Sequence, residues 1–347
     1  MARRKLTKQE VVGFAQSIQS LLTNLQSHDM TLNGPQYQSF MNTVIKSFSL
    51  KKFITRIHYF NELLTPVFKA DKNRSVLEIG SGYGLNLIIL KFLGFEKVVG
   101  IELVESIAHN AQILMREAQQ HLDFSLDNCV TICGNAESTS FKDGMFDCVI
   151  ACEVISHVPS FDRVMRETNR ILTHNGFFVV SDGNNHSCLR LKRRRHKAWR
   201  SVRSSELHKR VMFLKEHFPD IDPQFRASIA LHTELLPLCE VERIVPDIIK
   251  TNKLPMNLYF EEYAPVFSSS GIWVEYGFYP AKLCKTFALY GFTSTLKAYI
   301  GSARGFPFNT VQTILNWLPN KLRFMFWPVF IMYAKKTAPP KYLIPDK

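Results

Sequence analysis

Residues Ser75–Asn86, with the sequence SVLEIGSGYGLN, join a short apolar run to three glycines at alternate positions. A strand that runs into a glycine-rich turn and then a helix brings backbone N–H groups and the positive end of the helix dipole to one place. Glycine suits such a turn because the backbone takes unusual dihedral angles there and a ligand must approach it closely. The stretch therefore predicts a ligand-binding loop between a strand and a helix.

The spacing of the glycines argues against the two common kinds of phosphate-binding loop. A dinucleotide loop, G-x-G-x-x-G, would need a glycine where the chain has Leu85, and no lysine follows at the position that a P-loop requires. The pattern present is E-x-G-x-G-x-G, formed by Glu78, Gly80, Gly82 and Gly84. A carboxylate at this place suits a cationic ligand and would repel a pyrophosphate.

Around this loop, nearly all-apolar strand patterns alternate with helical ones, which is typical of a parallel sheet covered on both faces. The sequence predicts strands at 75–79, 97–103, 130–134, 146–154 and 176–183, with helices at about 84–93, 105–121 and 161–172. The alternation stops for about 100 residues after Gly183 and resumes with strand-like runs at 289–301 and 327–336.

Four further segments follow the loop in order: VVGIELVES with Glu102, which lies 24 residues after Glu78, then GNAESTSF, FDCVIACEVISHV and ILTHNGFFVVSDG. Together with the loop they resemble the class I S-adenosylmethionine-dependent methyltransferases, particularly the type 11 group that acts on small molecules, over about residues 70–185. The resemblance implies an α/β fold with a doubly wound, mostly parallel, Rossmann-like sheet of seven strands, the last one antiparallel.

The resemblance also implies four segments along the chain. Residues 1–70 would form an N-terminal helical segment and 71–183 the α/β core that binds S-adenosylmethionine. Residues 184–286 would be a helical and aromatic insertion after strand five that covers the substrate, and 287–347 would complete the sheet. Gly176 is expected to form the tight reversal before strand five.

The implied cofactor is S-adenosyl-L-methionine. Glu78 would face its methionine end, while Glu102 would accept the ribose hydroxyls, a role that carboxylates also have in NAD enzymes. Leu103 would line the adenine pocket. The full set of expected cofactor-binding residues is Glu78, Gly80, Ser81, Gly82, Gly84, Glu102, Leu103, Asn135, Ala136, Glu137, Cys152 and Glu153.

A hydroxyl acceptor would benefit from a base with a pKa near neutrality, which suits histidine. His157 follows the fourth strand and is the first candidate for a catalytic role, with Asp182 and His186 as rivals. No metal site is expected, because the seven cysteines include no C-x-x-C pair.

Composition limits the partners. Of the formal net charge of +13, residues 190–210 carry +9, so the basic character belongs to one segment. This segment would hold an anionic small-molecule or glycoconjugate acceptor, or rest on an anionic membrane; nucleic acid is not favoured. We expect a soluble, cytoplasmic protein, because no apolar run approaches the roughly 18 residues of a spanning helix.

The predicted function is methyl transfer from S-adenosylmethionine to a hydroxyl of a small molecule, glycan precursor or lipid-linked intermediate. An RNA-directed methyltransferase, an NAD-dependent oxidoreductase and a non-catalytic Rossmann-like binding scaffold stay open as alternatives. The sequence lacks N-P-P-Y or D-P-P-Y after strand four, which argues against the common enzymes that methylate amino groups of DNA and RNA.

Overall fold

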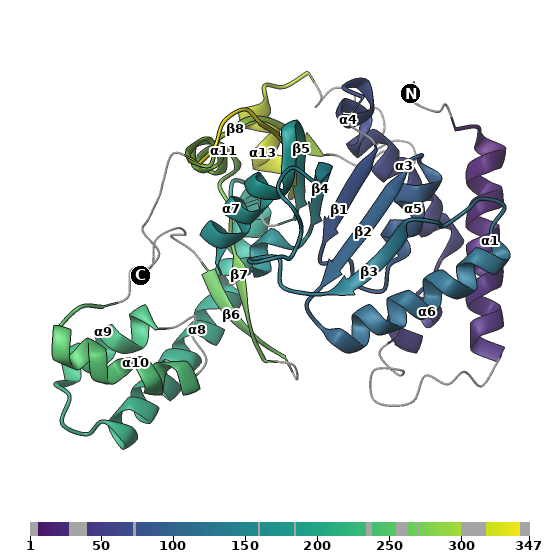
Figure 1. The fold of residues 1–347 in the computed structure, drawn as a ribbon. Helices are drawn as coiled ribbons and strands as arrows, with labels where there is room; N and C mark the ends of the chain where they lie inside the picture. The colour runs from purple at the N-terminus through teal and green to yellow at the C-terminus, as the bar shows by residue number, and fades with distance from the viewer. Residues whose placement is uncertain are drawn as a thin grey trace.

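A computed structural model describes residues 6–27, 40–71, 74–158, 160–183, 185–233, 238–254, 263–268, 271–299 and 317–340. Its centre is a seven-stranded sheet with the strand order β3-β2-β1-β4-β5-β9-β8 (Figure 1). The strands are β1 (Ser75–Ile79), β2 (Lys97–Glu102), β3 (Cys129–Cys133), β4 (Phe146–Cys152), β5 (Leu172–Asp182), β8 (Phe292–Tyr299) and β9 (Val329–Lys336).

Pairing within the sheet confirms the predicted fold class. β1 to β5 pair in parallel, whereas β9 runs antiparallel between β5 and β8. The chain passes from β1 outward to β3 and then returns to β4 on the other side of β1. This reversal opens a crevice at the carboxyl ends of β1 and β4, which is where open α/β sheets bind ligands.

Helices cover both faces of the sheet because strand residues alternate in direction and both sets are apolar. One face packs against α1 (Lys8–Ser27), α3 (Leu50–Leu63), α4 (Thr65–Lys69), α5 (Leu85–Phe92) and α6 (Glu105–His121). The other packs against α7 (Phe161–Ile171) and α11 (Pro280–Leu289). Three short helices are also present: η1 (Met41–Lys46), η2 (Ile155–His157) and α13 (Asn320–Phe326).

Between β5 and α11 the chain leaves the sheet. α8 (Leu189–His217), α9 (Pro223–His232) and α10 (Leu238–Thr251) form a lobe with a small apolar core of its own (Figure 1). The insertion is helical in part, and its aromatic stretch forms strands: β6 (Tyr263–Ser268) and β7 (Gly271–Tyr276) pair as an antiparallel hairpin. Strand-forming aromatic and β-branched residues dominate this stretch.

The tight bend expected at Gly176 is present, but it lies within β5 and not before it: Asn175 has a φ of 60°, and five residue steps of β5 oppose two of β4. β5 already begins at Leu172, and its pairing with β4 shifts register between Phe146 and Cys148. Gly176 lies within this irregular part of the strand, where a Cβ would come 2.9 Å from the carbonyl oxygen of Thr173. Close backbone approach at this bend therefore requires glycine here.

None of the helices in the described ranges is both long and apolar enough to cross a membrane.

Candidate functional site

The loop after β1 is held in a shape that only glycine adopts easily. Gly80, Gly82 and Gly84 have φ angles of 68°, 53° and 83°, in the left-handed region. A Cβ on Gly80 would come 2.6 Å from the side chain of Val154, whereas a Cβ on Gly82 would meet nothing within 4 Å. The loop thus packs tightly on one side and leaves open space beside Gly82.

Glu102, at the end of β2, is tied to this loop. Its Oε2 accepts a hydrogen bond from the Gly82 N–H at 3.0 Å, and its Oε1 accepts one from the Val104 N–H at 3.1 Å. Each carboxylate oxygen has further lone pairs for a ligand's hydroxyl groups. The next side chain, Leu103, is 57% exposed, which is unusual for leucine and offers an apolar surface beside the carboxylate.

Glu78 is fully buried at the base of the loop and joins a polar relay. Asn86 Nδ2 donates to Glu78 Oε1 at 2.6 Å, and Arg56 Nε donates to Asn86 Oδ1 at 2.6 Å. Burial raises the pKa of Glu78 to about 8, although the bond from Asn86 and the charge of Arg56 both oppose this rise. Near neutral pH the carboxyl group is thus largely protonated, and a cationic ligand would favour its ionisation.

The segment after β3 contains an Asx turn, in which Asn135 Oδ1 accepts from the Glu137 N–H at 2.9 Å. Glu137 faces the start of α7: its Oε1 accepts from the Ser160 N–H at 2.7 Å, and Arg163 lies 3.9 Å from its Oε2. Burial raises the pKa of Glu137. Because Glu137 is engaged with α7, Asn135, which is exposed, is the more available polar side chain here.

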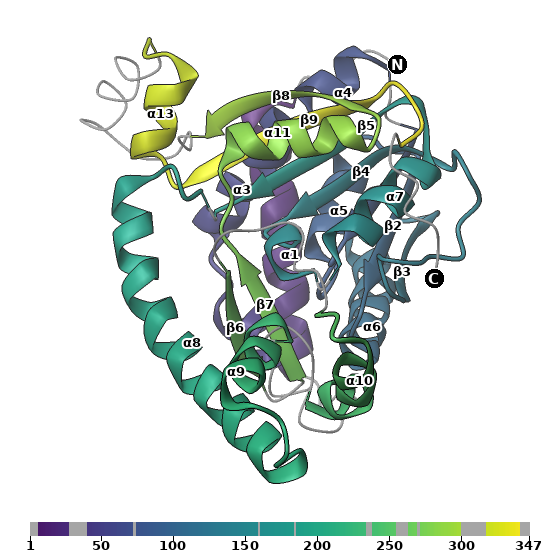
Figure 2. The ribbon, with the colours of Figure 1, turned by 90° about the vertical axis from the view of Figure 1, so that its left-hand side faces the viewer.

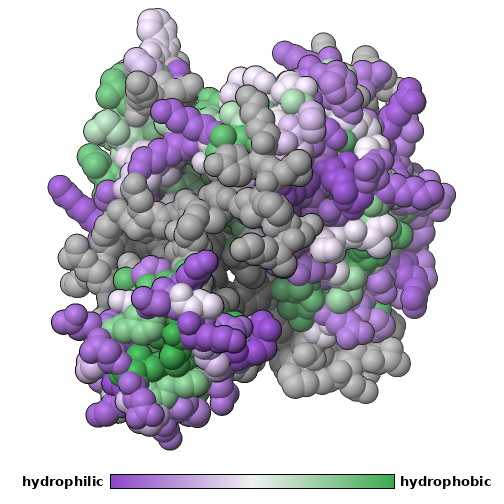
Figure 3. Space-filling view, turned by 60° about the vertical axis from the view of Figure 1, so that its left-hand side comes forward, coloured by the Kyte–Doolittle hydropathy of each residue, from purple (hydrophilic) through white to green (hydrophobic). Residues whose placement is uncertain are grey.

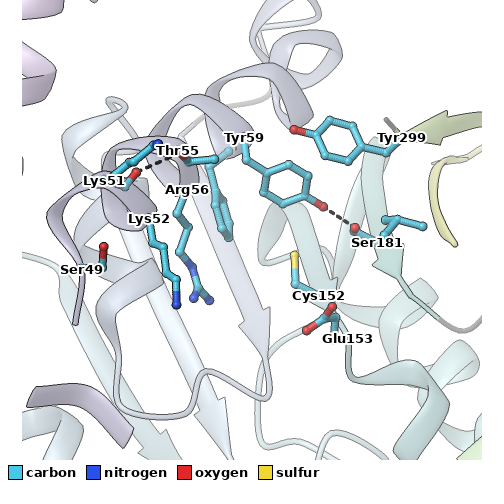
Figure 4. A pocket seen from close by; sticks show the side chains of 12 residues that line it. Ser49, Lys51, Lys52, Thr55, Arg56, Tyr59, Cys152, Glu153, Ser181 and Tyr299 are labelled. Carbon is cyan, nitrogen blue, oxygen red and sulfur yellow. Dashed lines mark hydrogen bonds between the residues drawn. The ribbon is translucent and has the colours of Figure 1, made fainter. Parts of the chain in front are cut away.

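A cavity of about 870 Å³ opens between α3 and the carboxyl ends of β4 and β5 (Figure 4). Its size is in the range of small-molecule sites. Lys52, Arg56 and Tyr59 project into it from α3, while Cys152 and Glu153 face them from the end of β4. The described lining residues are Ser49, Lys51, Lys52, Thr55, Arg56, Tyr59, Phe60, Cys152, Glu153, Ser181, Tyr299 and Val329.

One hydrogen bond crosses the cavity wall, between the Tyr59 hydroxyl of α3 and Ser181 Oγ of β5 (Figure 4). Burial, and next the nearby Cys152, raise the pKa of Tyr59 well above its usual range. The pKa of Cys152 is raised too, first by burial and then by Glu78. Both groups therefore stay neutral near pH 7.

Comparison with known proteins bears on this arrangement. A family model described as a methyltransferase domain matches residues 77–180. The rice (Oryza sativa subsp. japonica) 24-methylenesterol C-methyltransferase 2 is 29% identical over 126 residues, which cover 36% of this chain and 32% of that protein. The Bartonella quintana ubiquinone biosynthesis O-methyltransferase is 30% identical over 134 residues, which cover 37% and 51%.

A third relative, sterol 4-C-methyltransferase strm-1 of Caenorhabditis elegans, is 29% identical over 111 residues, which cover 32% of this chain and 31% of that protein. The chain thus spans about a third to a half of the length of these three relatives. Residues 77–180 form a methyltransferase domain, and they are the part of the chain that resembles the class I S-adenosylmethionine-dependent enzymes.

The residues of this methyltransferase domain fit its cofactor. The open space beside Gly82 admits a ligand, and Glu102 can accept hydrogen bonds from ribose hydroxyls. Buried Glu78 has an Oε2 that lacks a hydrogen-bond partner within the described ranges, which suits a cationic group. Ser81 is likewise buried, with a hydroxyl that has no partner among the described residues.

The three expected catalytic residues of the methyltransferase lie apart from the cavity lining. His157 is half-buried in η2, and Asp182 is buried at the end of β5. Because successive strand residues face opposite sides, Asp182 points away from the face on which Ser181 meets Tyr59. His186 is buried, and its ring packs against Gly277 and lies edge-on to Tyr279. Their catalytic roles stay predictions.

The sequence prediction missed the contribution of α3. Lys52, Thr55, Arg56 and Tyr59 share one face of this helix at helical spacing and line the cavity. The signal that could have found them is the polar side of the helical pattern that precedes the glycine loop. Its apolar side, with Phe53 and Phe60, is buried against the sheet.

Proposed function

We propose that this chain transfers a methyl group from S-adenosylmethionine to a hydroxyl oxygen of a small molecule, glycan precursor or lipid-linked intermediate. The observation that carries the proposal is the position of the cavity. It ends at Cys152 and Glu153, where β4 stops, and it borders the relay of Arg56, Asn86 and Glu78. An acceptor in the cavity would thus lie beside the methionine end of the cofactor.

The bound cofactor supplies an electrophilic methyl group on a cationic sulfur. Glu78 would attract the ammonium group, and Arg56 would bind the carboxylate, since no described side chain forms an ion pair with its guanidinium. Glu102 would hold the ribose, while Leu103 and Asn135 would contact adenine. The polar side chains among these already form hydrogen bonds within the protein, which favours alignment over chemical assistance.

Proton removal from the acceptor hydroxyl needs a group that touches it. Glu153 is the one carboxylate among the described lining residues, and its φ of 56° aims it from the end of β4. We assign it the orientation of the acceptor hydroxyl and the uptake of its proton as the oxygen takes the methyl group and S-adenosylhomocysteine is released, in addition to its expected place beside the methionine end. His157, Asp182 and His186 would act only if the acceptor extends from the cavity towards η2 and β5.

The insertion at 184–286 is proposed to select the acceptor. Among the described residues, none from this insertion lines the cavity, but β7 lies against η2, directly after the end of β4. The insertion thereby approaches the expected methyl-transfer position from outside. An acceptor larger than the cavity would meet it.

The test is incubation of the chain with S-adenosylmethionine labelled in its methyl group and with fractionated cell extract. We expect the label in a small-molecule, glycan or lipid fraction, as a methyl ether. Glu102→Ala should lower the transfer about 5- to 150-fold, the equivalent of 1–3 kcal/mol for a lost charged hydrogen-bond partner. Glu105→Ala, which removes an exposed carboxylate three residues away, should not.

Label confined to RNA would overturn the small-molecule acceptor. Calorimetry that shows binding of NAD(H) and none of S-adenosylmethionine would overturn the proposed reaction. Tight cofactor binding without label in any fraction would favour a binding scaffold.

A further inference from the structure

An apolar helix face is exposed at one corner of the molecule. In α13, Leu322, Met325 and Phe326 follow the i, i+3, i+4 spacing of a single face and are all exposed, with Phe326 at 55%. Trp317, just before the helix, is 86% exposed. Phe324 points the other way and is buried in the core. Figure 2 shows α13 projecting at the upper left, and Figure 3 shows hydrophobic residues gathered there.

The start of the basic helix is fixed to this face. Asn185 Nδ2 donates to the carbonyl oxygens of Phe324 and Trp327 at 2.9 and 2.7 Å. Cys188 Sγ donates to the carbonyl oxygen of Phe326 at 3.7 Å. α8 begins at the next residue, and its first turns expose Leu189, Arg190 and Arg193. The segment with a local charge of +9 therefore starts beside the apolar face.

The same corner borders the cavity. β9 begins at Val329, three residues after α13 ends, and Val329 lines the cavity together with Tyr299. The lining there is apolar and aromatic. A molecule that left the apolar face could thus reach the cavity over a short distance along the protein surface.

We propose that this corner docks on a membrane that contains anionic phospholipid, and that the acceptor reaches the cavity from that membrane. Trp317 and the exposed face of α13 would enter the interface, where aromatic side chains are favoured, while Arg190 and Arg193 would meet the headgroups. The part of the inference that concerns the acceptor rests on the proposed methyl transfer. The docking itself does not.

Charge and size favour a membrane over a protein partner. A stable protein interface buries on the order of 1,000 Å² or more, with polar groups around its apolar centre. The exposed face of a helix of seven residues offers much less. A membrane needs no such area, because each cation near an anionic surface adds roughly a fivefold gain in binding.

The test is cosedimentation of the full chain, without cofactor, with vesicles of phosphatidylcholine alone or mixed with phosphatidylserine. We expect binding to the mixed vesicles that weakens with added salt. Leu322→Ser with Phe326→Ser should lower the bound fraction at least tenfold, and Arg190→Glu with Arg193→Glu should do the same. The matched control is Leu231→Ser with Ile249→Ser, two exposed apolar residues in α9 and α10.

Thermal unfolding and calorimetry with S-adenosylhomocysteine should show that all three double variants keep the fold and cofactor affinity. The proposal is overturned if the native chain does not bind the mixed vesicles, or if the control loses as much binding as the α13 variant. Self-association that the α13 variant abolishes, without vesicle binding, would assign the face to a second copy of this chain. Vesicle binding without cofactor binding would instead overturn the methyl transfer alone.

Discussion

The two halves of the candidate site are built in different ways. The cofactor half centres on one continuous stretch, from Glu78 to Glu102, and the main contacts of this stretch join a loop backbone to a carboxylate. The cavity half draws its walls from α3, β4, β5, β8 and β9, which are up to 280 residues apart along the chain, from Ser49 to Val329. Side-chain bonds join α3 to two of the other walls: Tyr59 bonds to Ser181 of β5, and Lys297 of β8 donates to Glu62 at 2.6 Å.

The cofactor half is therefore expected to be more rigid than the cavity half. Positive φ angles and backbone hydrogen bonds fix the glycine loop, so that its geometry tolerates little change. Long side chains such as Lys52 and Arg56 line the cavity and can change rotamer. We therefore expect substitutions in the cofactor half to act sharply on cofactor affinity, and those in the cavity half to act more gradually.

The largest effect is expected for Gly82→Val. A side chain there would occupy the open space that the cofactor needs, and the affinity for S-adenosylhomocysteine should fall at least a hundredfold, as measured by calorimetry. Gly144→Val is the matched control, because its φ of 61° resembles the 53° of Gly82 and its Cβ would also meet no atom closer than 3.9 Å. Both variants should lose similar stability, and equal affinity loss in both would refute the site.

A smaller effect is expected for Arg56→Gln. Arg56 joins the two halves of the site through its hydrogen bond to Asn86. If Arg56 binds the cofactor's carboxylate, S-adenosylhomocysteine should bind about tenfold more weakly, as for a lost charged hydrogen bond. 5′-Methylthioadenosine, which lacks the amino-acid part, should bind within about twofold of the native affinity. Arg116→Gln, an exposed arginine on α6, is the control.

The alternative for Arg56 is an indirect action through Glu78, whose pKa its charge lowers. In that case the loss in Arg56→Gln would vanish at a pH well above 8, where Glu78 is ionised in the variant as well. A loss that persists at that pH supports direct contact with the carboxylate.

Glu78 itself should give cofactor binding a pH dependence. Its pKa of about 8 means that a cationic ligand must displace a proton near pH 7. The affinity for S-adenosylmethionine should therefore rise, by at most tenfold per unit, between about pH 6 and pH 8. Glu78→Gln should lower the affinity and remove this part of the dependence. Calorimetry in two buffers measures the proton release on binding and so checks this pH dependence.

The stability of the chain gives an independent control on Glu78. The pKa of Glu78 is about 8 in the folded chain, compared with its usual value of 4.5. The contribution of Glu78 to the free energy of unfolding is therefore full below about pH 4.5 and is lost as the pH rises through 8. Glu78→Gln should therefore gain stability relative to the native chain between pH 5 and pH 9. A constant difference in melting temperature would contradict the raised pKa.

The sheet could be predicted because each strand is a local apolar run, and its order follows from the class that the loop indicates. β1 and α6 have the expected bounds, while β5 begins four residues earlier because the bulge near Gly176 has no local apolar signature. The hairpin of β6 and β7 was missed, since its alternating aromatic residues also fit a folded lid without strands.

In the candidate site, too, the residues with a local sequence pattern could be predicted and the others could not. Glu78 and Glu102 could be located because their spacing is a property of the sequence, and the structure brings both to the glycine loop. The cavity could not, because Tyr59, Ser181 and Val329 meet only after the chain has crossed the sheet several times. His186 illustrates the limit: only the fold shows that its ring packs against Gly277, and its catalytic role stays a prediction.

The smallest effect is expected where the two walls of the cavity are joined, at Tyr59 and Ser181. Tyr59→Phe and Ser181→Ala should each lower the free energy of unfolding by about 1 kcal/mol, the scale for a single buried hydrogen bond. Neither should change the affinity for S-adenosylhomocysteine by more than about twofold, because the bond lies outside the glycine loop. If the bond accounts for the losses, the double variant should be no less stable than the single ones. Strictly additive losses in chemical denaturation would show that the two hydroxyls act separately, and that α3 is held over the cavity by its other contacts, such as those of Arg56 with Asn86 and of Glu62 with Lys297.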